Sequence, residues 1–345
     1  MTNDEIIRSL REYDGPDMKL MEICGSHTAA IARSGIRTLL SGKIHMVSGP
    51  GCPVCVTVTA YIDRLIELSR NRKNVICTFG DLIRVPGSSE NLGKARAEGA
   101  DIRMLYSPFD MLPLAEEEKD KTFIFAAVGF ETTAPVYAGL LSEAEDRRIE
   151  NIRLLTSLKT MPRVVERIGN RMDGYLLPGH VCTVSGFGTY EPLAEKLSIP
   201  FVVASFEPEN ILQAIYAMVM LKDKGIVRNF YPSAVTRDGN ALAREAVDKY
   251  FEAGDATWRG LGSIEGSGLY LRREYTGFDA GSAGLDDDHE TAGCHCAKVI
   301  CGEEKSEDCP LFGRSCTPSS PKGACMVSGE GACFNGYHSE MTKIS

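Results

Sequence analysis

The sequence predicts an α/β protein with two small parallel-sheet βαβ domains and a third, loop- and helix-rich domain at the C-terminus. Short apolar runs alternate with segments of helical spacing over the first 225 residues, which is typical of βαβ units. A charged stretch at 143–150 separates two groups of these units, and Gly, Ser, Asp and Cys dominate from Gly281 onward. We therefore expect domains over residues 1–148, 149–228 and 229–345.

Seven short apolar runs are the predicted strands. They cover residues 19–23, 44–47, 74–79, 122–128, 152–155, 175–177 and 201–204. A buried helix is predicted over 208–223, because Pro208 suits a helix first turn and apolar residues follow it. A second helix is predicted over 241–251. Residues 281–345, the C-terminal segment, hold few apolar residues, so we expect something other than side-chain packing to order them.

Composition argues against two classes of partner. The chain has 345 residues, 43% of them hydrophobic, and a formal net charge of -9. Scattered Lys and Arg on an acidic protein do not form the basic surface that nucleic acids need. No run reaches the roughly 20 apolar residues of a membrane span, and residues 1–13 lack the apolar core of an export signal. We expect a soluble, cytoplasmic protein with neither nucleic acid nor membrane as a partner.

Twelve cysteines are present, and seven of them fall in the last 52 residues. In a chain that carries an export signal, such a cluster would indicate a disulfide framework. Without such a signal, metal binding or redox chemistry is the better interpretation of this cluster.

The residues with distinctive chemistry follow the predicted strands. Six motif loops, at 24–28, 49–55, 80–81, 129–133, 178–182 and 206–208, each begin where an apolar run ends. The carboxyl ends of parallel strands form the ligand crevice of open sheets, because the loops there vary freely and helix N-termini point inward. The six loops therefore predict one shared site.

Three cysteines of these loops are candidates for soft-metal or redox chemistry. Cys52 and Cys55 form a CxxC motif at the start of a helix predicted over 57–69, where the helix dipole would favour a thiolate. A reversible dithiol/disulfide pair follows from that position, and half of a zinc site is the alternative. Cys24 can supply a single thiolate for iron, although a lone cysteine after a strand is commonly a buried apolar residue.

Histidines and acids in the same loops have open roles. His27 and His180 can act as general acid/base, as ligand partners, or as turn residues that hydrogen-bond the backbone. Asp81, Glu131 and Glu207 can orient thiolates or cap the helices that follow. The sequence does not decide between these roles.

The C-terminal segment carries the strongest metal signal. Four of its cysteines, separated by fourteen, six and sixteen residues, are Cys294, Cys309, Cys316 and Cys333. Four thiolates in a loop-rich segment suit a [4Fe-4S] cluster, and a tetrahedral zinc site stays open as the alternative. Cys296 and Cys325 lie near these positions and could form a redox disulfide, whereas Cys301 has no evident role.

Five motifs together resemble the HypD family of NiFe hydrogenase maturation proteins. They are Cys-Gly-Ser-His-Thr at 24–28, Gly-Pro-Gly-Cys-Pro-Val-Cys at 49–55, Gly-Phe-Glu-Thr-Thr-Ala-Pro at 129–135, Pro-Gly-His-Val-Cys at 178–182 and Cys-Pro-Leu-Phe-Gly at 309–313. The resemblance runs over residues 21–333, which is nearly the whole chain.

The resemblance implies a scaffold on which one iron, as Fe(II), acquires two cyanides and one carbon monoxide before transfer to a hydrogenase large subunit. Implied partners are a small HypC-type chaperone, which supplies a second thiolate, and a HypE-type cyanide donor. By motif, Cys24 matches the iron-holding thiolate, and His27 matches a position in the same motif. The remaining matches are Cys52 and Cys55 as the dithiol pair, Cys296 and Cys325 as a pair near the cluster, and Cys294, Cys309, Cys316 and Cys333 as ligands of the [4Fe-4S] cluster.

Two other functions fit the same cysteines. A thiol-disulfide reductase that takes electrons from ferredoxin would use the cluster and the CxxC motif but would not need Cys24. A zinc-stapled binding module would need neither iron nor redox activity. Iron content and the effect of a Cys24 substitution distinguish the three functions.

Overall fold

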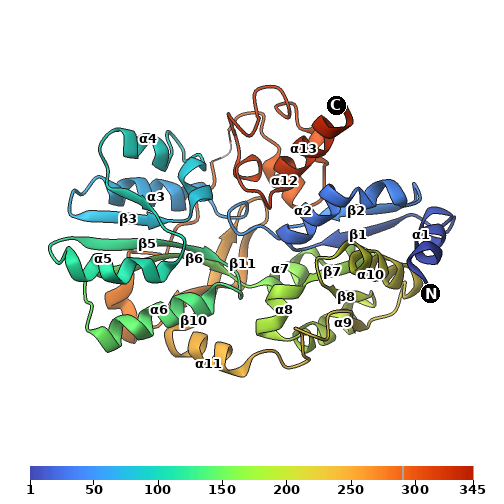
Figure 1. The fold of residues 1–345 in the computed structure, drawn as a ribbon, viewed down its shortest axis with the longest axis horizontal. Coiled ribbons are helices and arrows are strands. Elements are labelled where there is room, and N and C mark those ends of the chain that lie inside the picture. Colours follow the sequence, from blue (N-terminus) through green and yellow to red (C-terminus); the bar gives the residue numbers. More distant parts are fainter. Residues whose placement is uncertain (290, 345) are drawn as a thin grey trace.

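The computed structural model describes residues 1–289 and 291–344, the last four as helical backbone only. It confirms the predicted α/β fold with parallel-sheet βαβ units. Figure 1 shows two sheets side by side, with the C-terminal segment over their junction. The strands are β1 Met18–Glu22, β2 Ile44–Ser48, β3 Asn74–Thr78, β4 Ile102–Met104, β5 Thr122–Gly129, β6 Ile152–Lys159, β7 Gly174–Pro178, β8 Phe201–Ala204, β9 Val227–Asn229, β10 Phe251–Trp258 and β11 Gly262–Leu271.

Helices connect these strands and end the chain. They are α1 Asn3–Arg11, α2 Gly25–Ser34, α3 Thr59–Ser69, α4 Leu92–Ala97, α5 Met111–Glu117, α6 Ala134–Arg147, α7 Met161–Ile168, α8 Gly179–Ser185, α9 Glu191–Leu197, α10 Pro208–Met220, α11 Ala241–Tyr250, α12 Cys296–Ile300 and α13 Ala332–Ile344. The two helices predicted over 208–223 and 241–251 are α10 and α11. Among the described residues, no helix has the length and apolar character needed to cross a membrane.

The first sheet has the order β2-β1-β7-β8-β9, and all its pairings are parallel. The strand β7 is buried at every position, as expected for a strand covered on both faces. The N-terminal strands β1 and β2 therefore share a sheet with strands more than 120 residues further along the chain. This pairing brings the loop after β1 next to the loop after β7.

The second sheet has the order β10-β11-β6-β5-β3-β4. Its strands from β6 to β4 are parallel, whereas β10 and β11 form a hairpin that pairs antiparallel to β6. Sequence analysis expected helix, loop and turn in this region and missed the hairpin. Small residues such as Gly254 and Gly268 interrupt its apolar alternation, which hides the strand signal.

Strand pairing crosses the boundary predicted at residues 148 and 149. β5 lies before that boundary and β6 after it, yet the two pair along seven residues from Phe123 to Gly129. Each sheet thus takes strands from separate parts of the chain, since β1 pairs with β7 in the other sheet. Apolar periodicity locates strands along the sequence but does not report which of them pair.

The C-terminal segment packs against both sheets. Cys296, Val299, Ile300 and Met326 are buried in one core cluster that also contains Met21 of β1 and Trp258 of β10. These buried residues contribute to the packing of the segment, and the expectation that a further group helps to order it stays a prediction.

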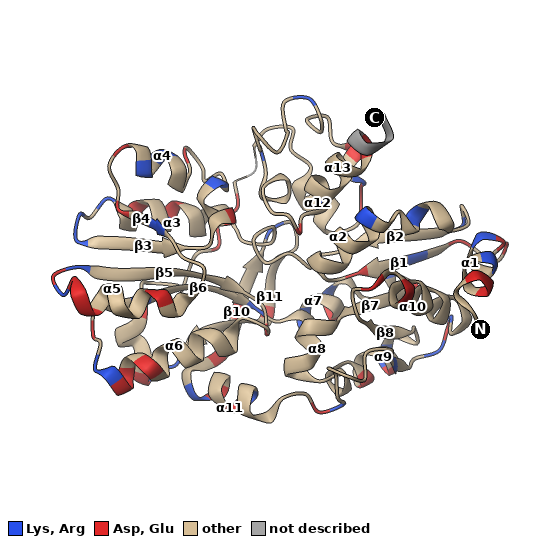
Figure 2. Ribbon diagram, in the orientation of Figure 1, with Lys and Arg blue, Asp and Glu red and all other residues tan. Residues whose placement is uncertain are grey.

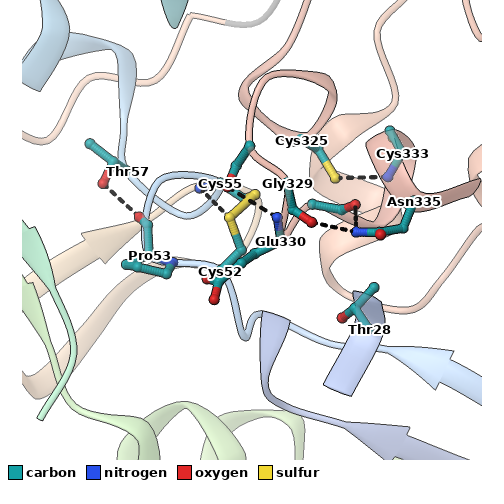
Figure 3. The surroundings of a disulfide bond; sticks show 12 residues. Thr28, Cys52, Pro53, Cys55, Thr57, Cys325, Gly329, Glu330, Cys333 and Asn335 are labelled. Carbon is teal, nitrogen blue, oxygen red and sulfur yellow. Dashed lines mark hydrogen bonds between the residues drawn. A yellow bond between two sulfur atoms is a disulfide. The ribbon is translucent and has the colours of Figure 1, made fainter. Parts of the chain in front are cut away.

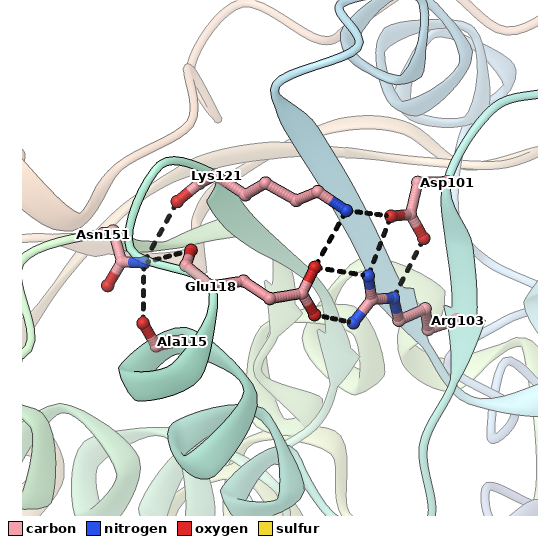
Figure 4. A network of polar contacts seen from close by, with 6 residues as sticks. All are labelled: Asp101, Arg103, Ala115, Glu118, Lys121 and Asn151. Atoms are coloured by element: carbon pink, nitrogen blue, oxygen red, sulfur yellow. Dashed lines mark hydrogen bonds and ion pairs between the residues drawn. The ribbon is translucent and has the colours of Figure 1, made fainter.

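Lys and Arg residues, and Asp and Glu residues, are scattered along the ribbon of both lobes (Figure 2). One ion-pair network fastens the edge strand β4 to the connection between α5 and β5 (Figure 4). Arg103 of β4 donates to both carboxylate oxygens of Asp101 and of Glu118, and Lys121 pairs with the same two acids. These pairs lower the pKa of Glu118 to about 2, with the Arg103 hydrogen bond as the largest cause.

Candidate functional site

Cys24 lies where β1 gives way to α2. It is the N-cap of α2 with extended backbone angles, φ -145° and ψ 121°, and its side chain is 8% exposed. Burial raises the pKa of the Cys24 thiol to about 12, and the backbone N–H groups of His27 and Ser26 counteract this rise. The sulfur therefore sits at the positive end of a ten-residue helix but is desolvated, so its free thiol stays protonated at neutral pH.

A buried acid anchors this loop, and sequence analysis did not single it out. Glu22, the last residue of β1, is fully buried, and it accepts hydrogen bonds from Thr28 Oγ1 at 2.6 Å and from the Cys24 backbone N–H at 3.3 Å. Burial raises its pKa to about 7. An acidic residue near the end of a predicted strand, directly before a cysteine motif, was the signal that could have revealed it.

Cys52 and Cys55 form a disulfide, and both are buried (Figure 3). The prediction that this CxxC motif opens a helix is wrong, because the motif forms a turn and α3 begins only at Thr59. Within the turn, the backbone N–H of Cys55 points to the Cys52 sulfur at 3.1 Å.

The Cys24 loop and the CxxC loop are in direct contact. The backbone N–H of Gly25 donates to the carbonyl of Gly51 at 2.9 Å. A Cβ on Gly51 would lie 2.3 Å from the Cys24 backbone nitrogen, which is far inside contact distance. Glycine at this position thus allows the two cysteine motifs to approach each other backbone to backbone. The structure brings these two motif loops together, as the shared-edge argument predicted.

His27 is fully buried in this loop. Its Nε2 lies 3.1 Å from the carbonyl of Ser205. The His27 ring packs on the Phe206 ring, with 4.8 Å between the ring centres, and the Phe206 ring also contacts the His180 ring, with 4.3 Å between the centres. Burial lowers the pKa of His27 to about 4. The ring is therefore neutral at physiological pH, with Nε2 as the donor to Ser205. A catalytic role for His27 stays a prediction.

The loop after β5 supplies a second acid of the site, Glu131, with a buried carboxylate oxygen. Glu131 accepts the backbone N–H of Met161 at 2.8 Å through Oε1, while its Oε2 is buried with no hydrogen-bond partner among the described residues. Burial raises the pKa of Glu131 to about 7. Cys182 and Tyr190 lie nearby and are fully buried. Burial is the largest cause that raises the pKa of Tyr190, and the charges of Cys182, Glu131 and Cys24 raise this pKa further.

Glu330, just before α13, joins the C-terminal segment to the Cys24 loop. It accepts a hydrogen bond from Ser26 Oγ at 3.1 Å, and a Cβ on Gly25 would lie 2.3 Å from the Glu330 Cβ. Burial raises the pKa of Glu330, and the charge of Asp81 from the loop after β3 adds to this rise. Sequence analysis missed Glu330, because an isolated acid in a Gly-rich stretch carries no recognisable signal.

Three of the four predicted cluster ligands lie together. Burial raises the pKa of the Cys316 thiol, and so do the neighbouring thiols of Cys294 and Cys309. The Cys316 sulfur also accepts the backbone N–H of Lys322 at 3.4 Å. Gly323, which follows Lys322, has no side chain and so leaves room for the Cys294 sulfur: a Cβ at this position would lie 3.0 Å from the Cys294 Sγ.

The fourth predicted ligand joins this group through the predicted redox pair. The thiol of Cys296 interacts with Cys294 on one side and with Cys325 on the other. The Cys325 sulfur interacts with Cys333 and accepts its backbone N–H at 3.2 Å (Figure 3). The thiol of Cys301 donates to the carbonyl of Gly260 at 3.3 Å.

These thiols are soft donors of the kind that both iron-sulfur clusters and zinc accept. Among the described residues, no three His, Cys, Asp or Glu side chains are close enough to hold a single metal ion. In a [4Fe-4S] cluster each cysteine binds a different iron, so the four sulfur atoms do not have to converge on one point. A set of soft thiolate donors in one contiguous group fits that cofactor. Ligation by these cysteines stays a prediction.

Other predicted residues lie at the margins of the site. His180 and Glu207 are exposed, and the Glu207 side chain makes no capping hydrogen bond to α10. Asp81 is exposed at the start of a short 3-10 helix. Cys77 is fully buried in the core of the second sheet, as its apolar run implied.

Comparison with known proteins identifies the family. The family model for HypD, described as the hydrogenase formation hypA family, matches residues 2–340. The hydrogenase maturation factor HypD1 of Bradyrhizobium diazoefficiens is 41% identical, with 96% of this chain and 90% of that protein covered. A putative hydrogenase expression/formation protein of Methanocaldococcus jannaschii is 40% identical, with coverages of 92% and 90%. The hydrogenase maturation factor HypD of Escherichia coli is 39% identical, with coverages of 93% and 88%. The motifs, the fold and these relatives agree, and the chain belongs to the HypD family of hydrogenase maturation factors.

Proposed function

We propose that this chain is the scaffold and redox factor on which the Fe(CN)₂CO unit of NiFe hydrogenase is assembled. The observation that carries the proposal is the contact among three parts of the site. The Cys24 loop touches the Cys52–Cys55 loop through Gly51 and touches the C-terminal segment through Glu330. The thiol proposed to bind the metal, the disulfide proposed to carry electrons and the cysteine-rich segment are thus in contact.

Cys24 is the proposed ligand of the incoming iron. Its free thiol is protonated because it is buried, but a metal ion displaces that proton and binds the thiolate. The N–H groups of Ser26 and His27 and the positive end of α2 then stabilise the bound sulfur. Thiolate ligands suit Fe(II) that carries strong-field ligands. We propose that a small HypC-type chaperone supplies the second thiolate.

Cys52 and Cys55 are the proposed source of electrons for cyanide release. Oxidation of their dithiol forms the disulfide and releases two electrons and two protons. Cleavage of the S–C bond of a thiocyanate on a HypE-type partner consumes two electrons and one proton, giving a thiol and cyanide, and the second proton passes to solvent. The disulfide found here corresponds to the oxidised end of this cycle.

The C-terminal cysteines are proposed to restore the dithiol. Cys294, Cys309, Cys316 and Cys333 would hold a [4Fe-4S] cluster, which supplies low-potential electrons one at a time when bound. Cys296 and Cys325 lie between the two ends of this ligand set and are the proposed relay thiols. We further propose that the protein works in the cytoplasm and reaches the hydrogenase large subunit through its partner chaperone.

Infrared spectroscopy tests the scaffold function. The protein is purified anaerobically with a HypC-type chaperone, and bands of metal-bound cyanide and carbon monoxide are sought. We expect these bands in the unaltered complex, their loss in Cys24→Ala, and their retention in Cys77→Ala, which alters a buried cysteine away from the site. Bands that persist in Cys24→Ala, or that are absent from an intact, iron-loaded complex, contradict the proposal.

The disulfide also favours a second candidate, a ferredoxin-dependent thiol-disulfide reductase. That function uses Cys52, Cys55 and the cluster but does not require Cys24. A Cys24→Ala variant that supports hydrogenase maturation fully would favour it over the scaffold. Zinc without iron in the purified protein would reject both candidates in favour of a zinc-stapled binding module.

A further inference from the structure

Arg259 is a buried cation in the turn between β10 and β11, and its side chain is held from two sides. The residue is 3% exposed. Its Nη2 donates to Thr59 Oγ1 at 3.1 Å, and its Nε lies 3.2 Å from Asp288 Oδ1. In the described part of the chain, Asp288 is the only acid that pairs with Arg259, and the Nε–H has no aligned acceptor. A guanidinium keeps its charge when it is buried, so its field acts on the groups beside it.

The side chain of Arg259 faces the cysteine-rich segment. It shares the wall of one small cavity with Cys294 and Cys296, and its positive charge acts on the Cys296 thiol. Gly260, the next residue, has a φ of 77°, and a Cβ there would lie 2.7 Å from the Cα of Ala297 in α12. The turn and α12 therefore touch backbone to backbone, which holds the guanidinium close to the cysteines.

The same turn contacts the CxxC loop. The backbone N–H of Arg259 donates to the carbonyl of Val56 at 3.0 Å, and Val56 directly follows Cys55. Thr59, which accepts the hydrogen bond from the guanidinium, begins α3 just after that loop. Arg259 therefore joins the disulfide loop to the segment that carries the predicted cluster ligands.

We propose that Arg259 sets the reduction potential of the centre that the C-terminal cysteines hold, and so makes electron transfer to the disulfide possible. The inference rests on the proposed function, since it requires a [4Fe-4S] cluster at Cys294 and its partner cysteines. Reduction of such a cluster by one electron from a ferredoxin-type donor adds one negative charge, and no bond forms or breaks. Two such electrons, with two protons from solvent, convert the Cys52–Cys55 disulfide into the dithiol.

The physical basis is the attraction between a fixed positive charge and the added electron. Inside the protein the effective dielectric constant is far below that of water, so the buried guanidinium of Arg259 stabilises the reduced state. The carboxylate of Asp288 lies on the same guanidinium and offsets part of this effect. The two residues should therefore shift the potential in opposite directions when each is neutralised.

A potentiometric titration of the full chain tests this role. The protein is purified anaerobically, its iron is measured, and the reduced cluster is followed by electron paramagnetic resonance as sodium dithionite lowers the potential. We expect Arg259→Met to make the reduced state about tenfold less favourable, which for one electron is a potential about 59 mV lower. Asp288→Asn should raise the potential, because it removes a negative charge beside the guanidinium.

Two control variants separate charge from packing. Arg259→Lys keeps the positive charge and should keep most of the unaltered potential, although it loses the forked hydrogen bonding of the guanidinium. Arg244→Met alters an exposed arginine of α11, which lies on the opposite side of the two sheets from α12 (Figure 1). It should leave the potential unchanged.

The outcomes distinguish this inference from the proposed function. Opposite shifts in Arg259→Met and Asp288→Asn, at unchanged iron content, support the inference. An unchanged potential in iron-loaded Arg259→Met, or shifts of both variants in the same direction, overturns it and leaves the infrared test of the scaffold untouched. If Arg259→Met does not retain iron, Asp288→Asn decides, because only an upward shift agrees with the inference. Zinc without iron in the unaltered protein would overturn the inference and the proposed function together.

Discussion

Replacing Gly51 by alanine tests the contact between the Cys24 loop and the CxxC loop. The added Cβ would lie 2.3 Å from the Cys24 nitrogen and 2.5 Å from both the Cys24 Cα and the Ile23 carbonyl carbon. All three atoms belong to the backbone, so no side chain can rotate away. The two loops must separate by about 1 Å to reach ordinary contact distances, which strains the hydrogen bond from Gly25 to residue 51.

The cost of this substitution follows from two contributions. Overpacking a well-filled region typically costs about 1–3 kcal/mol. Weakening one backbone hydrogen bond adds about 1 kcal/mol. We therefore expect Gly51→Ala to lower the free energy of unfolding by about 2–4 kcal/mol. The iron ligand would also shift away from the disulfide, so the infrared bands of the chaperone complex should weaken.

Urea denaturation measures the loss, with Gly42→Ala as the matched control. Gly42 lies in an exposed turn, and a Cβ there would meet nothing within 4 Å. The control should change the free energy of unfolding by less than about 1 kcal/mol. A Gly51→Ala protein as stable as the control would refute the reasoning, because it would show that the two cysteine motifs do not depend on backbone contact.

Three further predictions concern pH and iron content. The raised pKa of Glu131 means that the folded state binds more protons than the unfolded state between pH 4.5 and about 7, so stability falls as the pH rises through this range. Glu131→Gln should show a smaller fall, because Glu22, whose pKa burial also raises to about 7, still contributes its own share, and denaturation at pH 5 and pH 7.5 measures the difference; a pH profile equal to that of the unaltered protein would contradict the assignment. Arg103 lowers the pKa of Glu118 to about 2, so its contribution is present above pH 4.5 and is lost as the pH falls toward 2. Arg103→Met should therefore destabilise the protein at pH 7 but much less at pH 2, and a constant difference would count against the network. Gly323→Ala should reduce the iron bound per chain, because its Cβ crowds a predicted ligand sulfur, whereas Gly329→Ala, which meets nothing within 4 Å, should retain it. Elemental analysis decides, and equal iron in both variants would reject the crowding argument.

Local patterns were sufficient to locate most strands and the principal helices. The run at 122–128 is apolar from Phe123 onward because β5 is covered on both faces there, and Pro208 marks the start of α10. The CxxC motif was misplaced onto a helix, since apolar spacing from Thr57 onward does not reveal that α3 starts two residues later. The β10–β11 hairpin was missed because glycines dilute its alternation.

The linear sequence by itself determined the family, the α/β class and the identities of the cysteines, because each depends on residue type and short-range spacing. Only the tertiary structure decided which strands pair across the predicted boundary, and that Glu22, Glu131 and Glu330 surround the cysteine loops. These acids lie far apart in the chain, and their pKa values depend on burial by elements that meet only after folding. Contacts of this kind are set by the packing of two sheets and the C-terminal segment, which no local pattern encodes.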